Sequence, residues 1–360
     1  MASKKQDNIQ STGKDMANDG KKPSRLQMAD LARLAGVSVA TVSRALSKSS
    51  LVNEQTRQRI EELASSLNYS VNVAAQNLRL KENRTVALVL PYSEQARQEV
   101  SDPFFLSMIG SVANVLTDHG MEMLFSRVSE EHLDSIGQLY LTGRAMGIIV
   151  IGQWHHHEVL NQLAMRRIPM VVWGARMPQQ LYCVVGSDNV AGGFAATDHL
   201  LSLGRKRILF LGDVELPEAA QRYQGYLDAH KQRGVPVAPN FCVAVPFEAE
   251  AARDAIASLC MGAVQFDAVF AASDLLAMTV INALSQRGYR VPEAISVVGY
   301  DDIEVARYFT PHLTTIRQPI AEASAAMVDS LLSMADGEAV ESKQFAVKLI
   351  ERESSRPGAA

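Results

Sequence analysis

The stretch that decides the N-terminal fold is MADLARLAGVSVATVSRAL at residues 28–46, followed by NEQTRQRIEELASSL at residues 53–67. Apolar residues recur here at spacings of three and four, which predicts three short helices in close succession. Gly36 is a stop signal for the first helix, and Ser38 is placed as the N-cap of the second. Two helices joined by a tight turn match helix-turn-helix geometry, although a generic pair of antiparallel helices has the same pattern.

The outer face of the second predicted helix is suited to DNA. At 100° per residue, Val42, Ala45 and Leu46 fall on one side of this helix and are predicted to pack inward. Small side chains on the other side would let the helix enter the major groove, where an arginine binds guanine through two hydrogen bonds. Hydroxyls and the free N–H groups of the first turn suit phosphates. This outer face and the helix start carry Ser38, Val39, Ala40, Thr41, Ser43 and Arg44.

Charge is unevenly distributed along the chain. Residues 1–84 carry 14 Lys and Arg against 8 Asp and Glu, whereas the remaining 276 residues carry 21 against 31. A basic front and an acidic remainder indicate an anionic partner at the N-terminal end. Residues 1–24 are polar and aperiodic, and they are predicted to be disordered.

From residue 85 onwards, short β-rich runs alternate with longer helical patterns. The runs are TVALVL (85–90), MEMLFSRV (121–128), GIIVIG (147–152), PMVVWG (169–174), CVVGSD (183–188), RILFLG (207–212), FCVAVP (241–246), AVFAAS (268–273) and ISVVGY (295–300), and a last strand, KQFAVKLIE, covers 343–351. This alternation predicts an α/β fold with helices on both faces of parallel sheets. Because so many units exceed one sheet, we expect two similar lobes, with a ligand at the carboxyl ends of their strands.

Several classes of protein and site are disfavoured. The longest apolar runs, such as residues 146–151, are far too short to span a bilayer, and the N-terminus lacks the apolar stretch of a secretory signal. Three widely spaced cysteines suit the reducing cytoplasm. Phosphate-loop, dinucleotide, nucleophile-elbow and zincin motifs are missing, so no cofactor is expected. Consecutive residues such as His155–His157 cannot all point at one ion, so they are predicted to rim the ligand cleft or to be solvated, and no metal site is expected.

The stretch from residue 28 onwards closely resembles the headpiece of the lactose-repressor (LacI/GalR) family. Its signature D-x-A-x-x-A-G-V-S-x-x-T-V-S-R-x-L is met at residues 30–46, and the resemblance extends over about residues 26–355. It implies a helix-turn-helix domain at 25–70, a hinge helix and linker at 71–84, and a two-lobed, doubly wound domain of the periplasmic-binding-protein type at 85–355. Lobe 1 would comprise about 85–187 and 317–343, and lobe 2 about 188–316 and 344–355.

The resemblance also assigns DNA contacts. Val39 and Ala40 stand where the family reads operator bases, Arg44 matches an arginine that reaches bases, and Ser38, Thr41, Ser43 and Asn53 match phosphate and backbone contacts. Asn72–Leu78 would form a hinge helix on DNA, with Leu78 wedged into the minor groove, or Leu78 would be an ordinary apolar linker residue. Val71 replaces the usual proline, and Arg79 and Leu80 stand where small residues are common.

In the large domain, the matching pieces are DPFF (102–105), GSDNVAGGFAATDHLLSLGRKRI (186–208), RYQGY (222–226), AASDLLA (271–277), VVGYDD (297–302) and TTIRQP (314–319). The family uses the arginine and aspartate matching Arg222 and Asp301 for effectors. Either residue has a structural alternative, as an ion-pair partner or a strand-end cap. The other candidate effector contacts are Phe104, Phe105, Gln153, Trp173, Ser273 and Asp274. One of the two phenylalanines would face the core, Trp173 would alternatively pack the lobe, and Asp274 would alternatively cap a helix.

These observations predict a cytoplasmic, homodimeric transcriptional regulator, a repressor of carbohydrate-utilisation genes. Double-stranded, near-palindromic operator DNA and a sugar or oligosaccharide effector are its expected partners, with no membrane. The effector would act by changing lobe closure. A dimer is expected rather than a tetramer, because no apolar heptads follow the last strand. The competing interpretations are a sugar-binding transport receptor and an α/β enzyme with Asp301 and Asp302 as an acid/base pair.

Overall fold

The computed structural model describes residues 27–46, 49, 51–67, 83–92, 99–237, 240–261 and 265–356. These residues form two compact units, which divide between Glu82 and Asn83. The predictions for the N-terminal extension 1–24, for Asn72 and Leu78, and for Val71, Arg79 and Leu80 lie outside the described residues.

The first unit is a three-helix headpiece, as predicted, with α1 at Met28–Ala35, α2 at Val39–Leu46 and α3 at Glu54–Ser66. Gly36 ends α1 with φ +65°, a left-handed conformation that glycine adopts without strain. Leu31, Val42 and Ile60 are fully buried where the three helices meet. In addition, the Arg59 side chain donates a hydrogen bond of 2.7 Å to the Ala35 carbonyl oxygen, which ties α3 to the end of α1.

Lobe 1 of the second unit is a six-stranded sheet in the order β11-β5-β4-β3-β1-β2. Its strands are β1 Thr85–Tyr92, β2 Glu122–Ser129, β3 Gly147–Ile151, β4 Met170–Trp173, β5 Cys183–Ser187 and β11 Lys343–Phe345. Alternate strand residues face opposite layers, as the two-residue period of a strand requires. One face packs against α5 (Pro103–Asp118) and α12 (Ile320–Ala335), and the other packs against η1 (Glu130–Ile136), α6 (Gly137–Leu141) and α7 (His157–Met165).

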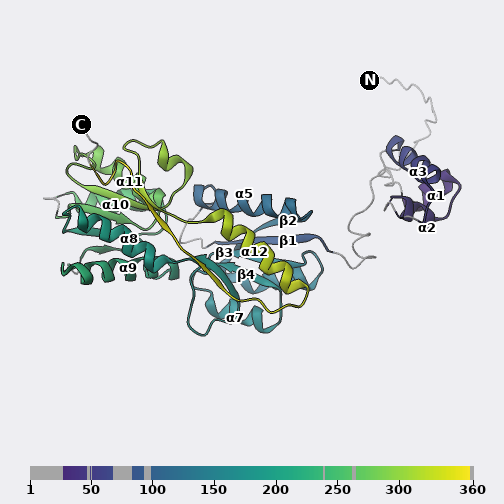
Figure 1. Ribbon diagram of the computed structural model, residues 1–360, viewed down its shortest axis with the longest axis horizontal. Helices are drawn as coiled ribbons and strands as arrows, with labels where there is room; N and C mark the ends of the chain where they lie inside the picture. Colours follow the sequence, from purple (N-terminus) through teal and green to yellow (C-terminus); the bar gives the residue numbers. More distant parts are fainter. Residues whose placement is uncertain are drawn as a thin grey trace, which may run out of the picture. The chain divides into compact units, whose positions relative to one another are not determined.

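Lobe 2 repeats this architecture with the strand order β12-β10-β9-β8-β6-β7. Its strands are β6 Ile208–Leu211, β7 Cys242–Val243, β8 Ala268–Ala271, β9 Ser296–Asp301, β10 Thr314–Arg317 and β12 Lys348–Ile350. Its helices are α8 Asn189–Ser202, α9 Pro217–Arg233, α10 Ala249–Leu259, α11 Asp274–Ser285 and the short η2 Glu304–Arg307. Figure 1 shows α8 and α9 on one side of this lobe and α10 and α11 on the other. All strand pairs are parallel except β10 with β12.

The chain passes between the lobes three times, from β5 to α8, from β10 to α12, and from β11 to β12. The predicted single strand KQFAVKLIE is therefore wrong, because β11 joins the sheet of lobe 1 and β12 joins that of lobe 2. Arg317 likewise ends a strand of lobe 2, although the sequence had placed it in lobe 1. Strands of either sheet have the same pattern of apolar residues, so the sequence pattern does not reveal where the chain passes from one sheet to the other.

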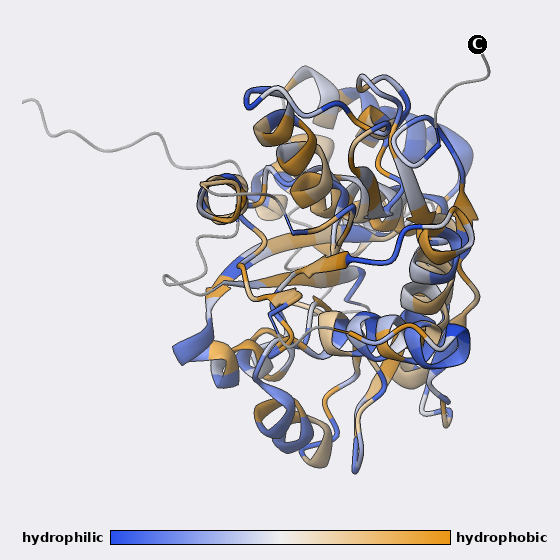
Figure 2. Cartoon of the chain, turned by 90° about the vertical axis from the view of Figure 1, so that its left-hand side faces the viewer, coloured by the Kyte–Doolittle hydropathy of each residue, from blue (hydrophilic) through white to orange (hydrophobic). Residues whose placement is uncertain are grey.

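One predicted strand is shorter than expected, because the run FCVAVP contributes only the two residues of β7. Between β2 and β3 the helical segment is the 3-10 helix η1 followed by the short α6. The interior of the lobes is apolar, and Figure 2 shows the orange hydrophobic strands between the helical layers. Among the described helices, none is both long and apolar enough to cross a membrane.

Candidate functional site

The exposed face of α2 carries the predicted DNA-reading residues. Val42 and Ala45 are fully buried against the other headpiece helices, whereas Val39, Ala40 and Arg44 are exposed. The helix is only eight residues long, so its tertiary contacts hold it in place rather than its own propensity. The buried side therefore fixes the rotation of α2 and leaves the opposite side available to a partner.

Polar side chains at two helix starts complete this surface. Ser38 Oγ accepts a hydrogen bond of 3.1 Å from the Thr41 N–H and lies 2.8 Å from Thr41 Oγ1. Asn53 caps α3 by accepting a 2.8 Å hydrogen bond from the Thr56 N–H. Ser38 and Asn53 are exposed, while Thr41 and Ser43 are half-buried. The caps leave other first-turn N–H groups outward, and such groups bind phosphate oxygens well.

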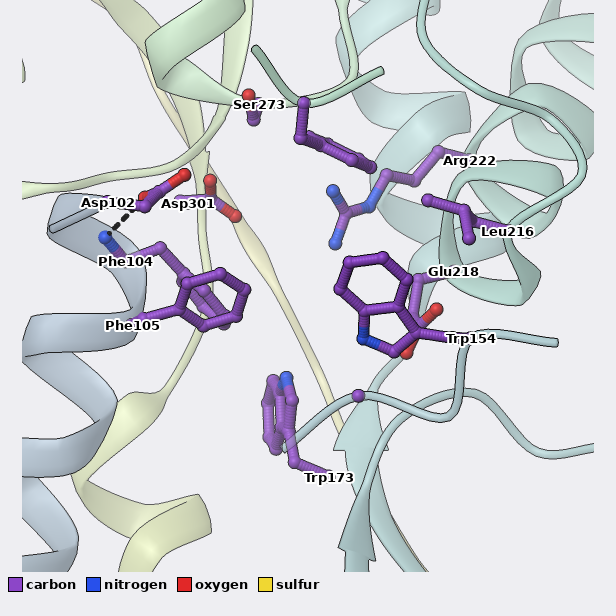
Figure 3. A pocket seen from close by; sticks show the side chains of 12 residues that line it. Asp102, Phe104, Phe105, Trp154, Trp173, Leu216, Glu218, Arg222, Ser273 and Asp301 are labelled. Carbon is purple, nitrogen blue, oxygen red and sulfur yellow. Dashed lines mark hydrogen bonds between the residues drawn. The ribbon is translucent and has the colours of Figure 1, made fainter. Parts of the chain in front are cut away.

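The second unit contains a pocket between its two lobes, with an empty volume of about 610 Å³. Figure 3 shows side chains from both lobes converging on this space, as expected at the carboxyl ends of parallel strands. The lining residues are Asp102, Phe104, Phe105, Gly152, Trp154, Trp173, Leu216, Glu218, Arg222, Phe247, Ser273 and Asp301. A pocket between two lobes, at the carboxyl ends of parallel strands, is a common site for a small organic ligand.

Lobe 1 supplies most of the aromatic wall. The Phe104 ring lies 5.7 Å from that of Phe105 and 6.4 Å from that of Trp173, measured between centroids. Phe105 and Trp173 are also buried in the core of lobe 1, so they hold the wall rigid, whereas Phe104 is half-buried and contacts both cores. Trp154 faces them across the space (Figure 3). Aromatic faces of this kind pack against the apolar side of a sugar ring.

Arg222 is held rigidly in the wall of lobe 2. Its Nε donates a 2.9 Å hydrogen bond to Asn189 Oδ1, and its Nη1 donates to the Ala272 carbonyl oxygen at 2.5 Å. The guanidinium carbon lies 3.7 Å from the centroid of the Tyr300 ring, a cation–π contact. Gly193 makes this arrangement possible, because a Cβ there would overlap the Arg222 backbone where α8 packs on α9.

Asp301, the last residue of β9, points into the pocket from lobe 2 with φ +122°, which is a strained conformation for a side chain other than glycine. Its Oδ1 accepts a 2.7 Å hydrogen bond from Gln318 Nε2, in the segment that crosses to lobe 1. Burial raises the pKa of Asp301 to about 7, while the nearby Arg222 guanidinium opposes that rise. A pocket carboxyl that is not fully paired within the protein is available to ligand hydroxyls.

Two further carboxyls line the pocket that sequence reasoning missed. Asp102 caps α5 by accepting a 2.9 Å hydrogen bond from the Phe104 N–H, and burial raises its pKa. Glu218 lies one turn before Arg222 on α9, and burial likewise raises its pKa. Asp102 belongs to the quoted DPFF motif, which is a signal that could have found it. Leu216, Glu218, Phe247, Gly152 and Trp154 carried no such signal.

Two predicted effector contacts do not line the pocket. Gln153 is fully buried, donates a 2.8 Å hydrogen bond to Tyr182 Oη and accepts one of 2.7 Å from the Ala175 N–H. Asp274 is also fully buried and accepts hydrogen bonds from the Ile303 N–H and the Thr315 hydroxyl. Both residues are therefore structural, because their polar atoms are already paired inside the protein.

Ser273 lines the pocket and is at the same time the N-cap of α11, since its hydroxyl accepts a 3.3 Å hydrogen bond from the Leu276 N–H. The predicted capping role of Asp274 therefore belongs to Ser273. Of the three consecutive histidines, His156 lies 3.4 Å from a Glu130 carboxylate oxygen and His157 lies 2.9 Å from Tyr182 Oη. Within the described ranges, no group of three metal-ligating side chains is brought together.

Comparison with known proteins matches both units. Residues 27–72 match the family described as "Bacterial regulatory proteins, lacI family", and residues 197–355 match the periplasmic binding protein-like domain. The HTH-type transcriptional repressor PurR of Edwardsiella ictaluri is 31% identical over 338 residues, which cover 91% of this chain and 96% of that protein. The chain belongs to the LacI family. Its helix-turn-helix headpiece and two-lobed domain are the architecture that the sequence predicted.

Solved structures agree with the fold of this LacI-family chain. The lac repressor dimer bound to operator and the anti-inducer ONPF has a TM-score of 0.82 at 23% identity, covering 92% of this chain and 99% of that one. The complex of the transcriptional regulator CelR with cellobiose has a TM-score of 0.67 at 28% identity, covering 92% of this chain and all of that one (100%).

Proposed function

We propose that this LacI-family protein is a sequence-specific repressor of carbohydrate-utilisation genes whose operator binding is controlled by a sugar-type effector. The observation that carries the proposal is the pairing of an exposed, motif-matching face on α2 with an aromatic and polar pocket between the lobes. One site suits DNA and the other suits a small polyol. A regulator of this kind acts on the chromosome, so we place it in the cytoplasm.

For DNA, we assign base contacts to Val39, Ala40 and Arg44 and phosphate contacts to Ser38, Thr41, Ser43 and Asn53. Exposure of the first three supports their role, since base edges are reached by side chains that project from the recognition helix. We retain Asn72 and Leu78 as proposed hinge contacts from the sequence alone. The partner is double-stranded operator DNA with near-palindromic half-sites.

For the effector, we assign hydrogen bonds to Arg222, Asp301 and Ser273 and ring contacts to Phe104, Phe105 and Trp173. All six line the pocket, and charged groups next to aromatic faces are what a sugar ring requires. The cellobiose complex of CelR, a protein 28% identical to this chain, supports a sugar as the ligand class. The effector would shift operator binding in proportion to its preference for one degree of lobe closure.

We propose that the protein acts as a homodimer. Two headpieces would then read the two half-sites of the operator. Exposed apolar side chains are present on the second unit, with Leu106 on α5 and Phe125 on the edge strand β2 in lobe 1 and Val305 and Tyr308 around η2 in lobe 2. These side chains are the candidates for contact with a second copy.

Catalysis by Asp301 and Asp302 is disfavoured on geometric grounds. The Asp301 carboxylate faces the pocket, whereas that of Asp302 is only 1% exposed and is ion-paired to Arg317 and Arg352. Two carboxylates that face opposite sides of a strand end do not act on one substrate bond. A regulator without catalytic activity is therefore our proposal.

The test starts from the operator. Selection from a randomised DNA library should return a near-palindrome, and Arg44→Ala should weaken binding to it by about 1–3 kcal/mol and relax one base preference. Arg33→Ala is the matched control, because Arg33 is an exposed arginine of the same headpiece on α1. If Arg44→Ala and Arg33→Ala bind the selected site equally well, α2 is not the reading helix.

A further inference from the structure

A second hollow opens beside the effector pocket and shares Asp102 and Phe247 with it. It has an empty volume of about 880 Å³ and lies between the start of α5 in lobe 1 and the start of α10 in lobe 2. We call it the mouth of the pocket. Its lining residues are Glu99, Ser101, Asp102, Pro103, Phe247, Glu248, Ala249, Glu250 and Leu275.

The mouth is acidic. Four of its described lining residues carry carboxylates, namely Glu99, Asp102, Glu248 and Glu250. No lysine or arginine is among the described residues that line the mouth. Glu99 and Glu250 are exposed, and Glu248 is half-buried. A hollow lined with one sign of charge and walled by low-dielectric protein concentrates ions of the opposite sign and depletes those of its own.

Acidic residues also outnumber basic ones among the described residues that line the inner pocket. Asp102, Glu218 and Asp301 face a single cation among the described lining residues, Arg222. The guanidinium of Arg222 is already engaged by Asn189, by a backbone carbonyl and by the face of Tyr300. Burial raises the pKa of each of these three carboxyls, and the nearby Asp102 carboxylate adds to the rise at Asp301.

An anionic ligand that enters through the mouth would therefore meet the carboxylates of its described residues before it reaches Arg222. A phosphate monoester carries a charge of about −1.5 to −2 at neutral pH and needs positively charged or multiple N–H partners. A hydroxyl group, by contrast, donates to a carboxylate and accepts from Arg222 without a net charge to neutralise. The two Trp rings and Phe104 supply ring contacts that need no charge on the ligand.

We propose that the effector is a carbohydrate without any anionic group, and that the carboxylates of the mouth exclude phosphorylated and acidic sugars. This inference rests on the proposed role of the pocket as the effector site. Glu99, Glu248 and Glu250 act at a distance, by setting which ions and ligands enter. An amino sugar, which carries positive charge, is admitted on the same grounds.

The first test needs no effector. Both tryptophans of the chain, Trp154 and Trp173, line the pocket, so the intrinsic fluorescence reports this space. Collisional quenching is compared for iodide, an anion, and acrylamide, a neutral molecule, at constant ionic strength in the full-length protein. The variant is the triple substitution Glu99→Gln, Glu248→Gln and Glu250→Gln.

The matched control changes the net charge equally with Asp118→Asn, Glu122→Gln and Glu338→Gln. These exposed residues lie away from the pocket, at the end of α5, at the amino end of β2 and after α12. The iodide quenching constant should rise about twofold or more in the triple variant and stay unchanged in the control. Acrylamide quenching should be unchanged in both. Equal iodide constants in the wild-type protein and the triple variant would overturn the proposal.

The second test uses matched ligands. Thermal stabilisation is measured with glucose, ribose and trehalose and with glucose 6-phosphate, ribose 5-phosphate and trehalose 6-phosphate. Any stabilising pair should show the larger shift for the unphosphorylated member, and a larger shift for a phosphate ester would overturn the proposal. If no carbohydrate at all stabilises the protein, the proposed function fails, while the iodide experiment still decides whether the mouth repels anions.

Discussion

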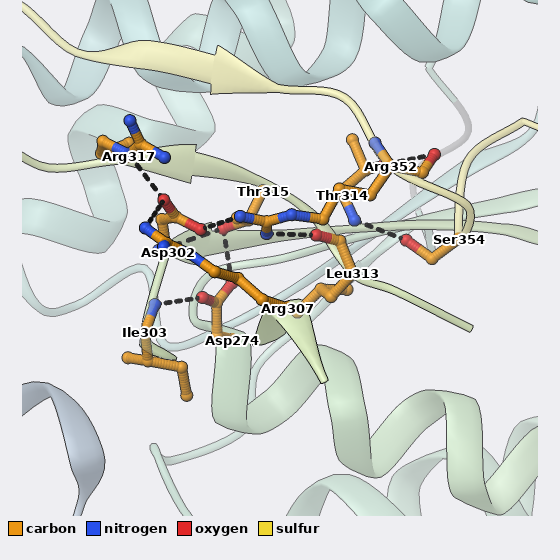
Figure 4. Close-up of polar contacts among 10 residues, drawn as sticks. All are labelled: Asp274, Asp302, Ile303, Arg307, Leu313, Thr314, Thr315, Arg317, Arg352 and Ser354. Carbon is orange, nitrogen blue, oxygen red and sulfur yellow. Dashed lines mark hydrogen bonds and ion pairs between the residues drawn. The ribbon is translucent and has the colours of Figure 1, made fainter. Parts of the chain in front are cut away.

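The two carboxylates at the end of β9 have contrasting surroundings. Asp301 faces the pocket, and its Oδ1 accepts a hydrogen bond of 2.7 Å from Gln318 Nε2. Asp302 faces the other way, where Arg317 Nε lies at 2.6 Å and Arg352 Nη2 at 2.5 Å from its two oxygens (Figure 4). Arg307 Nη2 lies 3.9 Å away. Neighbours in sequence thus line a pocket on one side and an internal ion-pair cluster on the other.

The difference shows how burial separates structure from recognition. A buried carboxylate surrounded by guanidinium groups is satisfied within the protein and costs stability when it is removed. A buried carboxyl with few partners has a raised pKa and unused hydrogen-bonding capacity, which a ligand can use. Both carboxylates also contact the crossing from β10 to α12, because Arg317, which binds Asp302, ends β10 and Gln318, which binds Asp301, follows it.

The largest expected effect comes from the internal cluster. Asp302→Asn should lower the free energy of unfolding by about 3–5 kcal/mol, because it leaves Arg352 and Arg317 without their shared carboxylate. Urea unfolding of the wild-type protein and the variant measures this loss. Asp301→Asn is the matched control, since it changes the neighbouring residue by the same atoms. A cost equal to that of the control would erase the contrast between the two positions.

The second effect should appear in binding rather than stability. Asp301→Asn should lower effector affinity by about one to two decades, because a charge-assisted hydrogen bond is worth about 1.5–3 kcal/mol. The melting temperature and operator affinity should stay near the wild-type values. Titration with whichever sugar stabilises the wild-type protein measures the first quantity. Joint loss of melting temperature, operator affinity and effector response would instead give Asp301 a structural role.

The sequence predicts the headpiece better than the pocket, because the headpiece depends on contacts between residues close together in the chain and the pocket does not. The headpiece is local: the caps at Ser38 and Asn53, the stop at Gly36 and the buried stripe of α2 are all set by residues a few positions apart. The exposed face of α2 therefore followed from helical periodicity. The DNA contacts of the headpiece and its hinge residues remain predictions.

The pocket is not local, and sequence reasoning recovered it only in part. Arg222, Asp301, Ser273, Phe104, Phe105 and Trp173 do line it, as motif matches at strand ends and helix starts had suggested. Gln153 was wrong, because the strand-end rule places a residue at the edge of the sheet without giving the direction of its side chain. Here Trp154, with φ +49°, turns into the pocket while Gln153 turns into the core. Glu218 and Phe247 also line the pocket from lobe 2, and no sequence motif marked either of them.

The smallest expected effect is a pH dependence of stability that comes from the Asp301 carboxyl. Burial raises the pKa of Asp301 to about 7 in the folded protein, whereas an unfolded aspartate has a pKa of about 4. Between these values the folded state keeps a proton that the unfolded state has lost, so this stabilising contribution is present at low pH and is lost as the pH rises through 7. The free energy of unfolding of the wild-type protein should therefore fall by on the order of 1 kcal/mol between pH 6 and 8, relative to Asp301→Asn. Urea unfolding at pH 6, 7 and 8 gives this difference, with Asp118→Asn as the control for an exposed carboxylate. Parallel curves for the wild-type protein and Asp301→Asn would mean that burial does not raise the pKa of the pocket carboxyl, and the contrast between the two sides of the strand end would no longer hold.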